Sequence, residues 1–319
     1  MTQQSFVIRR QTFWNEFELM IRGRKTLKSK AALFPRYYRE LTQDLNTARA
    51  HGFDPSIIER LNTLVLEGNQ ILYSNRSFSF RLMADFILRT FPRAVRERWR
   101  SLGAAMLIFY GIAFFFGYIC IRFPNMVYEI LGEDQAWQLE QMYNPLSEHF
   151  LVPREVSSDA DMFGFYIYNN ITIAFQTFAG GILAGFGSLL ILSINALFLG
   201  AAAGHIINQG FGVSFFPFII AHSAFELTAI VFSAQGGLIL GYRLFITRGL
   251  SRGASLREAG KTALPLISGA VLMLVIAACI EAFWSGHHEL SIFLRYGAGA
   301  SCWILLILYF LFAGRERKR

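Results

Sequence analysis

The amino-acid sequence predicts an all-α polytopic membrane protein with about six transmembrane helices and an N-terminal cytoplasmic helical domain. Of its 319 residues, 54% are hydrophobic, 16% are charged and 32 are Phe. A soluble domain has roughly 25% charged residues, so this chain carries more apolar surface than a soluble fold of the same size buries. The composition therefore excludes an ordinary soluble enzyme.

Stretches without charged side chains locate the transmembrane helices. The longest covers residues 162–225, which is too long for two tight spans because about 20 residues cross a bilayer as a helix. We therefore expect three crossings between residues 163 and 242. The alternative is a hairpin that enters and leaves through the outer face and turns between Gly180 and Gly187, although each of its limbs is long enough for a full crossing. The expected helices of the membrane domain, residues 101–314, are 102–122, 163–182, 186–207, 217–242, 263–284 and 297–313.

The distribution of charge predicts the orientation of the chain. Residues 1–100 contain 18 Lys or Arg and 9 Asp or Glu, whereas residues 123–161 contain one basic and eight acidic residues. The 243–261 loop and the tail, residues 315–319, are also basic. Because Lys and Arg beside membrane helices stay preferentially in the cytoplasm, we expect both termini in the cytoplasm and the acidic segment 123–161 outside.

The first hundred residues are expected to form a cytoplasmic helical domain. A helix over residues 36–51 should end at Gly52, and Asp54 with Pro55 has the pattern of an N-cap and first-turn proline for the next helix. Residues 77–100 interleave Phe and Leu with six Arg. Because a basic amphipathic helix beside a span is typical of binding to the anionic inner leaflet, we expect anionic lipid as its partner. No nucleic-acid motif accompanies these charges, so we expect no nucleic acid.

Four polar side chains within the expected spans form a candidate site, since ionisable groups at bilayer depth are costly and face a cavity or a partner. His222 and Glu226 are four residues apart and share a helix face. With a rise of about 1.5 Å per residue, Glu281 lies at the same depth as His222, and Asn195 lies near the middle of the third span. Three interpretations stay open: hydrogen bonds that pin helices together, an ion or proton pathway, and a catalytic or metal site.

The spacing of these residues argues against an enzyme. In the helical zinc-protease motif, Glu directly follows the first His and a second His comes three residues later. Here Glu226 follows His222 by four residues and no second His follows. We therefore expect no catalytic residue, no metal and no cofactor.

Glycines mark the expected close contacts between helices. Gly180 and Gly181 lie at the end of the second expected span, and Gly200 with Gly204 forms a GxxxG pattern in the third. Small residues allow membrane helices to approach closely. Such a contact forms either within one chain or between the two copies of a homodimer.

Short motifs follow one another in a distinctive order along the chain. In the membrane part they are Asn169-Asn170-Ile171, Ala174-Phe175, Asn195, Leu199-Gly200, His222, Phe225-Glu226-Leu227 and Ile280-Glu281-Ala282-Phe283; before it they are Phe6-Val7, Trp14, Glu18-Leu19, Tyr38-Arg39, Asp44-Leu45 and Leu61-Asn62. In this order the chain resembles the stage II sporulation protein M family, in the form common in non-spore-forming bacteria.

The resemblance implies an integral protein of the bacterial cytoplasmic (inner) membrane that is not itself an enzyme. In spore-forming bacteria, the family member belongs to a membrane-anchored assembly with peptidoglycan-degrading partners and is not regarded as the hydrolase. We therefore expect a membrane platform or assembly component for cell-envelope processes, with other envelope or membrane proteins as partners. The alternative is a transporter or channel, proton-coupled through the cluster of His222, Glu226, Glu281 and Asn195.

Overall fold

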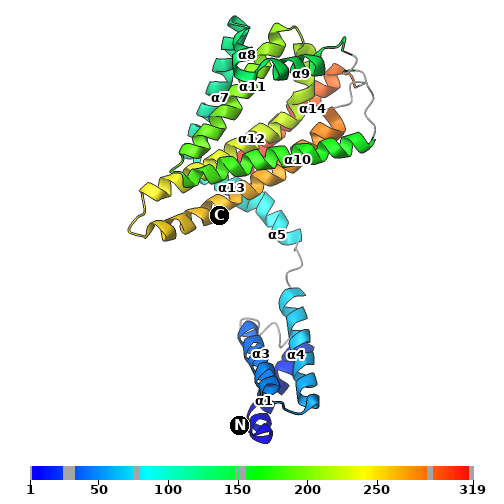
Figure 1. The fold of residues 1–319 in the computed structure, drawn as a ribbon, viewed down its shortest axis with the longest axis vertical. Coiled ribbons are helices and arrows are strands. Elements are labelled where there is room, and N and C mark those ends of the chain that lie inside the picture. Colours follow the sequence, from blue (N-terminus) through cyan, green and yellow to red (C-terminus); the bar gives the residue numbers. More distant parts are fainter. Residues whose placement is uncertain are drawn as a thin grey trace. The chain divides into compact units, whose positions relative to one another are not determined.

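The structure is a computed structural model that describes residues 2–23, 33–74, 80–147, 150, 156–285 and 290–315. The elements in these ranges are all helices (Figure 1), so the protein is an all-α polytopic membrane protein, as predicted. The chain divides into two compact units, Met1–Met83 and Ala84–Arg319. We call them unit 1 and unit 2 and describe each by itself.

Unit 1 is built from α1 (Gln3–Arg22), α3 (Phe34–Ala50) and α4 (Pro55–Ser74). The expected helix ends are confirmed: Gly52 has a positive φ of 61° after α3, and the Asp54 carboxylate accepts a hydrogen bond from the Ser56 backbone N–H at the start of α4. One apolar core joins the three helices through Phe6, Trp14, Phe17, Met20, Leu41, Leu45, Leu61 and Leu64.

A buried carboxylate links α3 to α1 in unit 1. Asp44 on α3 is only 7% exposed, and one of its oxygens accepts hydrogen bonds from Arg10 Nε at 2.7 Å and from Trp14 Nε1 at 2.8 Å. Both donors belong to α1. A buried polar group is tolerated where it is hydrogen-bonded, so Asp44 sets how α3 packs against α1.

Unit 2 contains five helices that are long and apolar enough to cross a membrane, counted over the described residues. Each overlaps one of the expected spans. α12 and α13 extend well beyond the spans expected at 217–242 and 263–284, because the length of the apolar run sets the span whereas a helix continues into the aqueous layers. The five are α7 (Trp99–Arg122), α11 (Phe186–Asn208), α12 (Gly212–Phe245), α13 (Arg252–Ile280) continued by the π-helix η3 (Glu281–Ser285), and α14 (Ile292–Phe312).

The remaining expected span corresponds to α10 (Val156–Ala179), which leads into a 3-10 turn, η2 (Gly180–Ile182). α10 is not among the five apolar helices, and Asn169 and Asn170 lower its hydropathy. Its 24 residues extend about 36 Å at 1.5 Å per residue, which is enough to cross a bilayer. A full crossing by α10 therefore stays a prediction, with the hairpin as its alternative.

The helices of unit 2 pack as neighbouring pairs (Figure 1). α12 lies along α13, α7 lies along α11, and α10 runs beside α12 and α13. Two short helices, α8 (Met126–Leu131) and α9 (Glu133–Tyr143), cover the end where α7 and α11 finish. These two helices come from the acidic segment, of which residues 148–149 and 151–155 lie outside the described part. The connection from α12 to α13 lies at the opposite end.

The glycines singled out in the sequence lie in contacts within the chain. A Cβ on Gly200 would lie 2.3 Å from the Ala113 carbonyl oxygen of α7, and one on Gly204 would lie 2.5 Å from the Gly117 carbonyl oxygen. A Cβ on Gly181 would lie 2.2 Å from the carbonyl oxygen of Gly237 in α12. Gly180 meets Gly187 across the η2 turn in the same way. A homodimer contact therefore needs a surface other than the one that Gly200 and Gly204 occupy.

The basic juxtamembrane segment differs from a single amphipathic helix. Its described part comprises α5 (Phe80–Asp85), a π-helical turn η1 (Phe86–Thr90) and α6 (Phe91–Glu97). Phe91 is buried in the core of unit 2, where its ring packs edge-on against Phe232. The ring also contacts Gly269, and a side chain at position 269 would occupy the space that the ring fills. Sequence periodicity could not reveal this insertion, because Phe232 and Gly269 lie more than 100 residues away along the chain. Residues 77–79 of this segment and 316–319 of the tail lie outside the described part.

Candidate functional site

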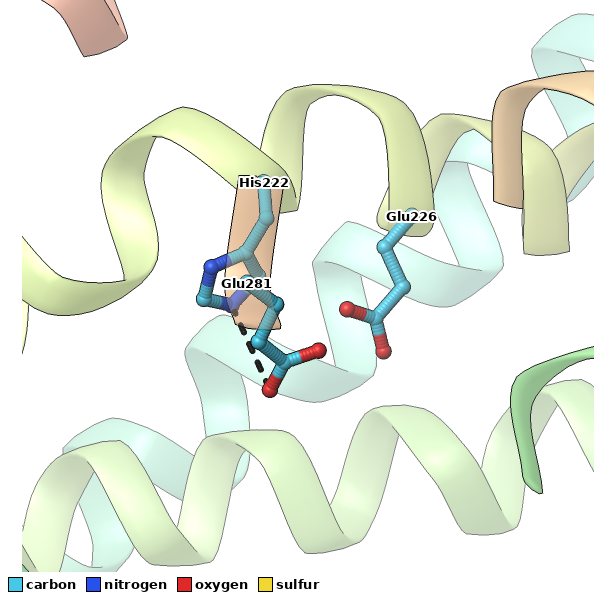
Figure 2. Close-up of side chains that lie close together, drawn as sticks. All are labelled: His222, Glu226 and Glu281. Carbon is cyan, nitrogen blue, oxygen red and sulfur yellow. Dashed lines mark ion pairs between the residues drawn. The ribbon is translucent and has the colours of Figure 1, made fainter. Parts of the chain in front are cut away.

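Two neighbouring helices of unit 2 position the candidate site. α12 carries His222 and Glu226 one turn apart, and the π-helical turn η3 carries Glu281. Figure 2 shows the side chains of His222 and Glu226 directed toward Glu281. π-Helical turns are rare and are found frequently at functional sites. We call these three residues the His–Glu cluster.

The side chains of the His–Glu cluster lie close together. One ligand atom from each residue lies within 4.8 Å of the others, and His222 Nε2 is 4.0 Å from a Glu281 carboxylate oxygen. His222 and Glu281 are buried, while Glu226 is partly buried. Among the described residues, this is the one group of three or more His, Cys, Asp or Glu side chains that could share a metal ion. No hydrogen bond or ion pair to Glu226 occurs within the described part of the chain.

Two residues that sequence reasoning missed support His222 and its neighbours. Ser285, four residues after Glu281, has its Oγ 3.0 Å from His222 Nδ1, so both ring nitrogens of His222 face η3. Arg295 of α14 is buried and donates from Nη2 to the Ser285 carbonyl oxygen at 3.1 Å. Arg295 lies two residues before the expected span 297–313. The position of this charged residue at the edge of an apolar run was the sequence signal that could have identified Arg295 as a candidate.

Asn195 does not join the His–Glu cluster through a hydrogen bond. Its amide donates to the Ile191 carbonyl oxygen at 2.8 Å, one turn earlier in α11. The next residue, Ala196, is fully buried between α11, α7 and α12. The sequence placed Asn195 near the middle of the third expected span, but a position along a span carries no information about which helices are neighbours.

A second His–Glu pair, absent from the sequence analysis, lies where α9 meets α11. His205 is buried, and its Nε2 is 2.8 Å from a Glu140 carboxylate oxygen. On the same helix as Glu140, Tyr143 packs its ring against Phe215 at 4.9 Å and Phe218 at 5.8 Å between centroids. Phe218 in turn packs edge-on against His222 at 5.6 Å. Aromatic packing therefore connects α9 to the His–Glu cluster.

The geometry of the His–Glu cluster suits three kinds of chemistry. Imidazole and carboxylate groups bind divalent metal ions, they exchange protons, and they hydrogen-bond helices together. A nucleophile of the Ser–His type needs a base within about 3 Å of a hydroxyl. Ser285 satisfies this distance from His222, and its side chain is fully buried in the described part of the chain.

These features define an integral membrane protein with a helical membrane unit, a His–Glu cluster within that unit and a separate helical unit earlier in the sequence. The family model for stage II sporulation protein M matches residues 105–286, more than half of the chain. The chain belongs to the stage II sporulation protein M family, which confirms the expected resemblance. A second family model, a domain of unknown function (DUF8413), matches residues 4–74, within unit 1. No curated protein and no solved structure matches the chain significantly.

Proposed function

We propose that this protein is a non-enzymatic membrane platform for cell-envelope processes, located in the bacterial cytoplasmic (inner) membrane with both termini in the cytoplasm. The observation that carries the proposal is the division into two units, each with its own apolar core. Two different family models match these units. A domain with its own core packs independently of its neighbour, so unit 1 is suited to binding a partner while unit 2 holds it at the membrane.

Exposed side chains on both units supply contact surfaces for such partners. Ile8 and Leu19 are exposed and eleven residues apart on α1, which places them on one face because eleven residues make three helical turns. On the side that the charge rule places outside, Trp137 is exposed on α9. The packing of Tyr143 against Phe215 holds α9 in place. Exposed apolar side chains on ordered helices favour protein contacts.

Site-specific photo-crosslinking in cells tests the platform proposal. We expect Ile8→p-benzoylphenylalanine and Trp137→p-benzoylphenylalanine each to give discrete crosslinked bands that contain another envelope protein. The matched control is Leu107→p-benzoylphenylalanine, because Leu107 is equally exposed but lies within the apolar length of α7, where lipid surrounds it. If neither Ile8 nor Trp137 gives a protein adduct above the Leu107 control, the platform proposal is wrong.

A second candidate function, proton- or cation-coupled transport, is favoured by one observation. The Glu226 carboxylate lies within 4.8 Å of His222 and Glu281, yet no hydrogen bond or ion pair holds it in the described part of the chain. A carboxyl group inside a membrane without a fixed partner is typical of a group that exchanges an ion. If the protein is instead a platform, the His–Glu cluster would stabilise the packing of α12 against the end of α13.

Ion flux into liposomes separates the two functions. If the protein transports, purified protein in liposomes should dissipate a pH gradient faster than empty liposomes, and Glu226→Gln should slow this flux at least about tenfold, because the amide cannot release a proton. The control is Glu133→Gln, which neutralises an exposed carboxylate on α9, far along the chain from the cluster. Flux equal to that of empty liposomes would reject transport and leave the platform as the function.

A further inference from the structure

A pocket of about 850 Å³ opens at the end of unit 2 opposite α8 and α9. Four separate segments line it: the start of α7, the turn before α11, the end of α12 and the start of α13. Its volume falls in the range of small-molecule sites, about 300–1,000 Å³. The pocket lies at the basic end of the membrane unit, which the charge rule places on the cytoplasmic side.

The lining of the pocket carries more positive than negative charge. Its lining includes four arginines, Arg98, Arg100, Arg243 and Arg248, and two glutamates, Glu97 and Glu258. The glutamates already have partners, since Glu258 pairs with Arg243 at 2.6 Å and Glu97 with Arg93 at 2.8 Å. Within the described residues, no acidic side chain pairs with the remaining three arginines. Among the described residues, no acidic side chain therefore offsets the charge that Arg98, Arg100 and Arg248 bring to the pocket lining.

The same pocket also presents apolar surface. Four aromatic side chains line it, and each is more than half exposed: Trp99, Phe186, Tyr242 and Phe245. Aromatic side chains gather where membrane helices meet the headgroup layer. A soluble anion would leave these rings in contact with water, whereas an acyl chain would cover them.

Hydrogen bonds from α12 hold the α6–α7 junction in position. Gln235 is fully buried, and its Nε2 donates to the carbonyl oxygens of Val95 at 3.0 Å and Arg98 at 3.3 Å. The Ser101 hydroxyl also donates to the Arg98 carbonyl oxygen, at 2.8 Å. The backbone that carries Arg98 and Arg100 is thus fixed before any ligand arrives, and preorganisation of this kind lowers the entropy cost of binding.

We propose that this pocket binds the phosphate headgroup of an anionic membrane lipid, with Arg98, Arg100 and Arg248 contacting the phosphate and with the aromatic wall contacting the acyl chains. Basic pockets between transmembrane helices on the cytoplasmic side have the chemistry to bind such headgroups, and guanidinium groups bind phosphate oxygens in pairs of parallel hydrogen bonds. The site differs from the broad attraction of a basic segment to the bilayer surface, because it is a cavity assembled from four segments. It does not depend on the platform function.

Native mass spectrometry of the full chain in detergent tests the proposal. Wild-type protein is titrated with dioleoyl phosphatidylglycerol and, separately, with dioleoyl phosphatidylcholine, which has the same chains and no net charge. We expect phosphatidylglycerol to bind at least about tenfold more tightly. We expect Arg98→Gln with Arg248→Gln to remove at least about tenfold of that affinity while leaving phosphatidylcholine binding unchanged. Equal binding of the two lipids to the wild type would overturn the proposal without any variant.

A matched double variant separates the pocket from general electrostatics. Arg252 and Arg257 lie at the same end of unit 2, at the start of α13, but do not line the pocket. Arg252→Gln with Arg257→Gln removes the same two charges and should change phosphatidylglycerol affinity less than twofold. If both double variants weaken binding equally, or if neither does, the pocket is not the lipid site. Circular dichroism checks that both double variants keep wild-type helix content.

A competition experiment identifies the source of the phosphate. Glycerol 1-phosphate carries a glycerol-linked phosphate without acyl chains. We expect millimolar glycerol 1-phosphate to leave bound phosphatidylglycerol in place, because it cannot cover the aromatic wall. Displacement of the lipid at that concentration would mean that the pocket takes a soluble phosphate compound, and the lipid assignment would be wrong.

Discussion

Replacing Asp44 by Ala is expected to destabilise unit 1 by about 3 kcal/mol, since removal of a buried hydrogen-bonded charge costs about 2–5 kcal/mol. The Asp44 carboxylate accepts hydrogen bonds from Arg10 and from the indole N–H of the buried Trp14. Without it, the Trp14 donor is buried and unsatisfied and Arg10 loses its closest carboxylate. Hydrogen exchange of the full chain, followed by mass spectrometry over α1, should show about a hundredfold loss of protection.

Glu40→Ala is the matched control for Asp44→Ala. Glu40 lies one turn before Asp44 on α3 and also pairs with Arg10, but at 3.7 Å and with a third of its side chain exposed. Exposed ion pairs contribute about 0–1 kcal/mol, so its removal should change protection less than about fivefold. Equal effects of the two substitutions would show that charge near Arg10, and not the buried hydrogen bonds of Asp44, stabilises the unit.

Replacing Gly200 by Ala is expected to destabilise unit 2 by about 2–3 kcal/mol, within the cost of overpacking a tight contact. The added Cβ would lie 2.3 Å from the Ala113 carbonyl oxygen and 3.0 Å from the Gly117 backbone nitrogen. Both are backbone atoms, so α7 and α11 must move apart as whole helices. Thermal unfolding in detergent, followed by circular dichroism, should show a midpoint about 5–10 °C lower.

Gly111→Ala makes the same chemical change on α7 where there is room for it. No heavy atom lies within 4 Å of the position its Cβ would take. Because Ala favours a helix over Gly by up to about 1 kcal/mol, this control should be as stable as the wild type or slightly more stable. Should Gly200→Ala change the oligomeric state while leaving the unfolding midpoint unchanged, the glycine face would lie between two chains and the contact within the chain would be wrong.

Much of the fold could be predicted from the sequence because its signals are local. The expected spans 102–122 and 186–207 match α7 and α11 to within three residues at each end. In unit 1, the positive φ of Gly52 and the cap at Asp54 could be predicted because the residue types themselves favour those conformations. A membrane crossing by α10 was harder to predict, because Asn169 and Asn170 interrupt its apolar run.

The candidate site could be predicted only in part. Helical periodicity places His222 and Glu226 on one face, and equal depth brought Glu281 into consideration. Asn195 was included as a polar side chain within an expected span, but its amide donates a hydrogen bond to the Ile191 carbonyl oxygen within α11. Ser285 and Arg295 were missed because their contacts with His222 and with each other cross between helices.

The class of the protein, the membrane helices of unit 2 and the small helical unit before them follow from the sequence, because hydropathy, charge and capping act over a few neighbouring residues. Contacts between distant segments do not: Phe91 fills the space beside Gly269, Gly200 lies against α7, and four distant segments assemble an arginine-lined pocket. The physical reason is that all membrane helices are similarly apolar. Which helices become neighbours therefore depends on the shapes of their packing faces and on a few hydrogen bonds between them.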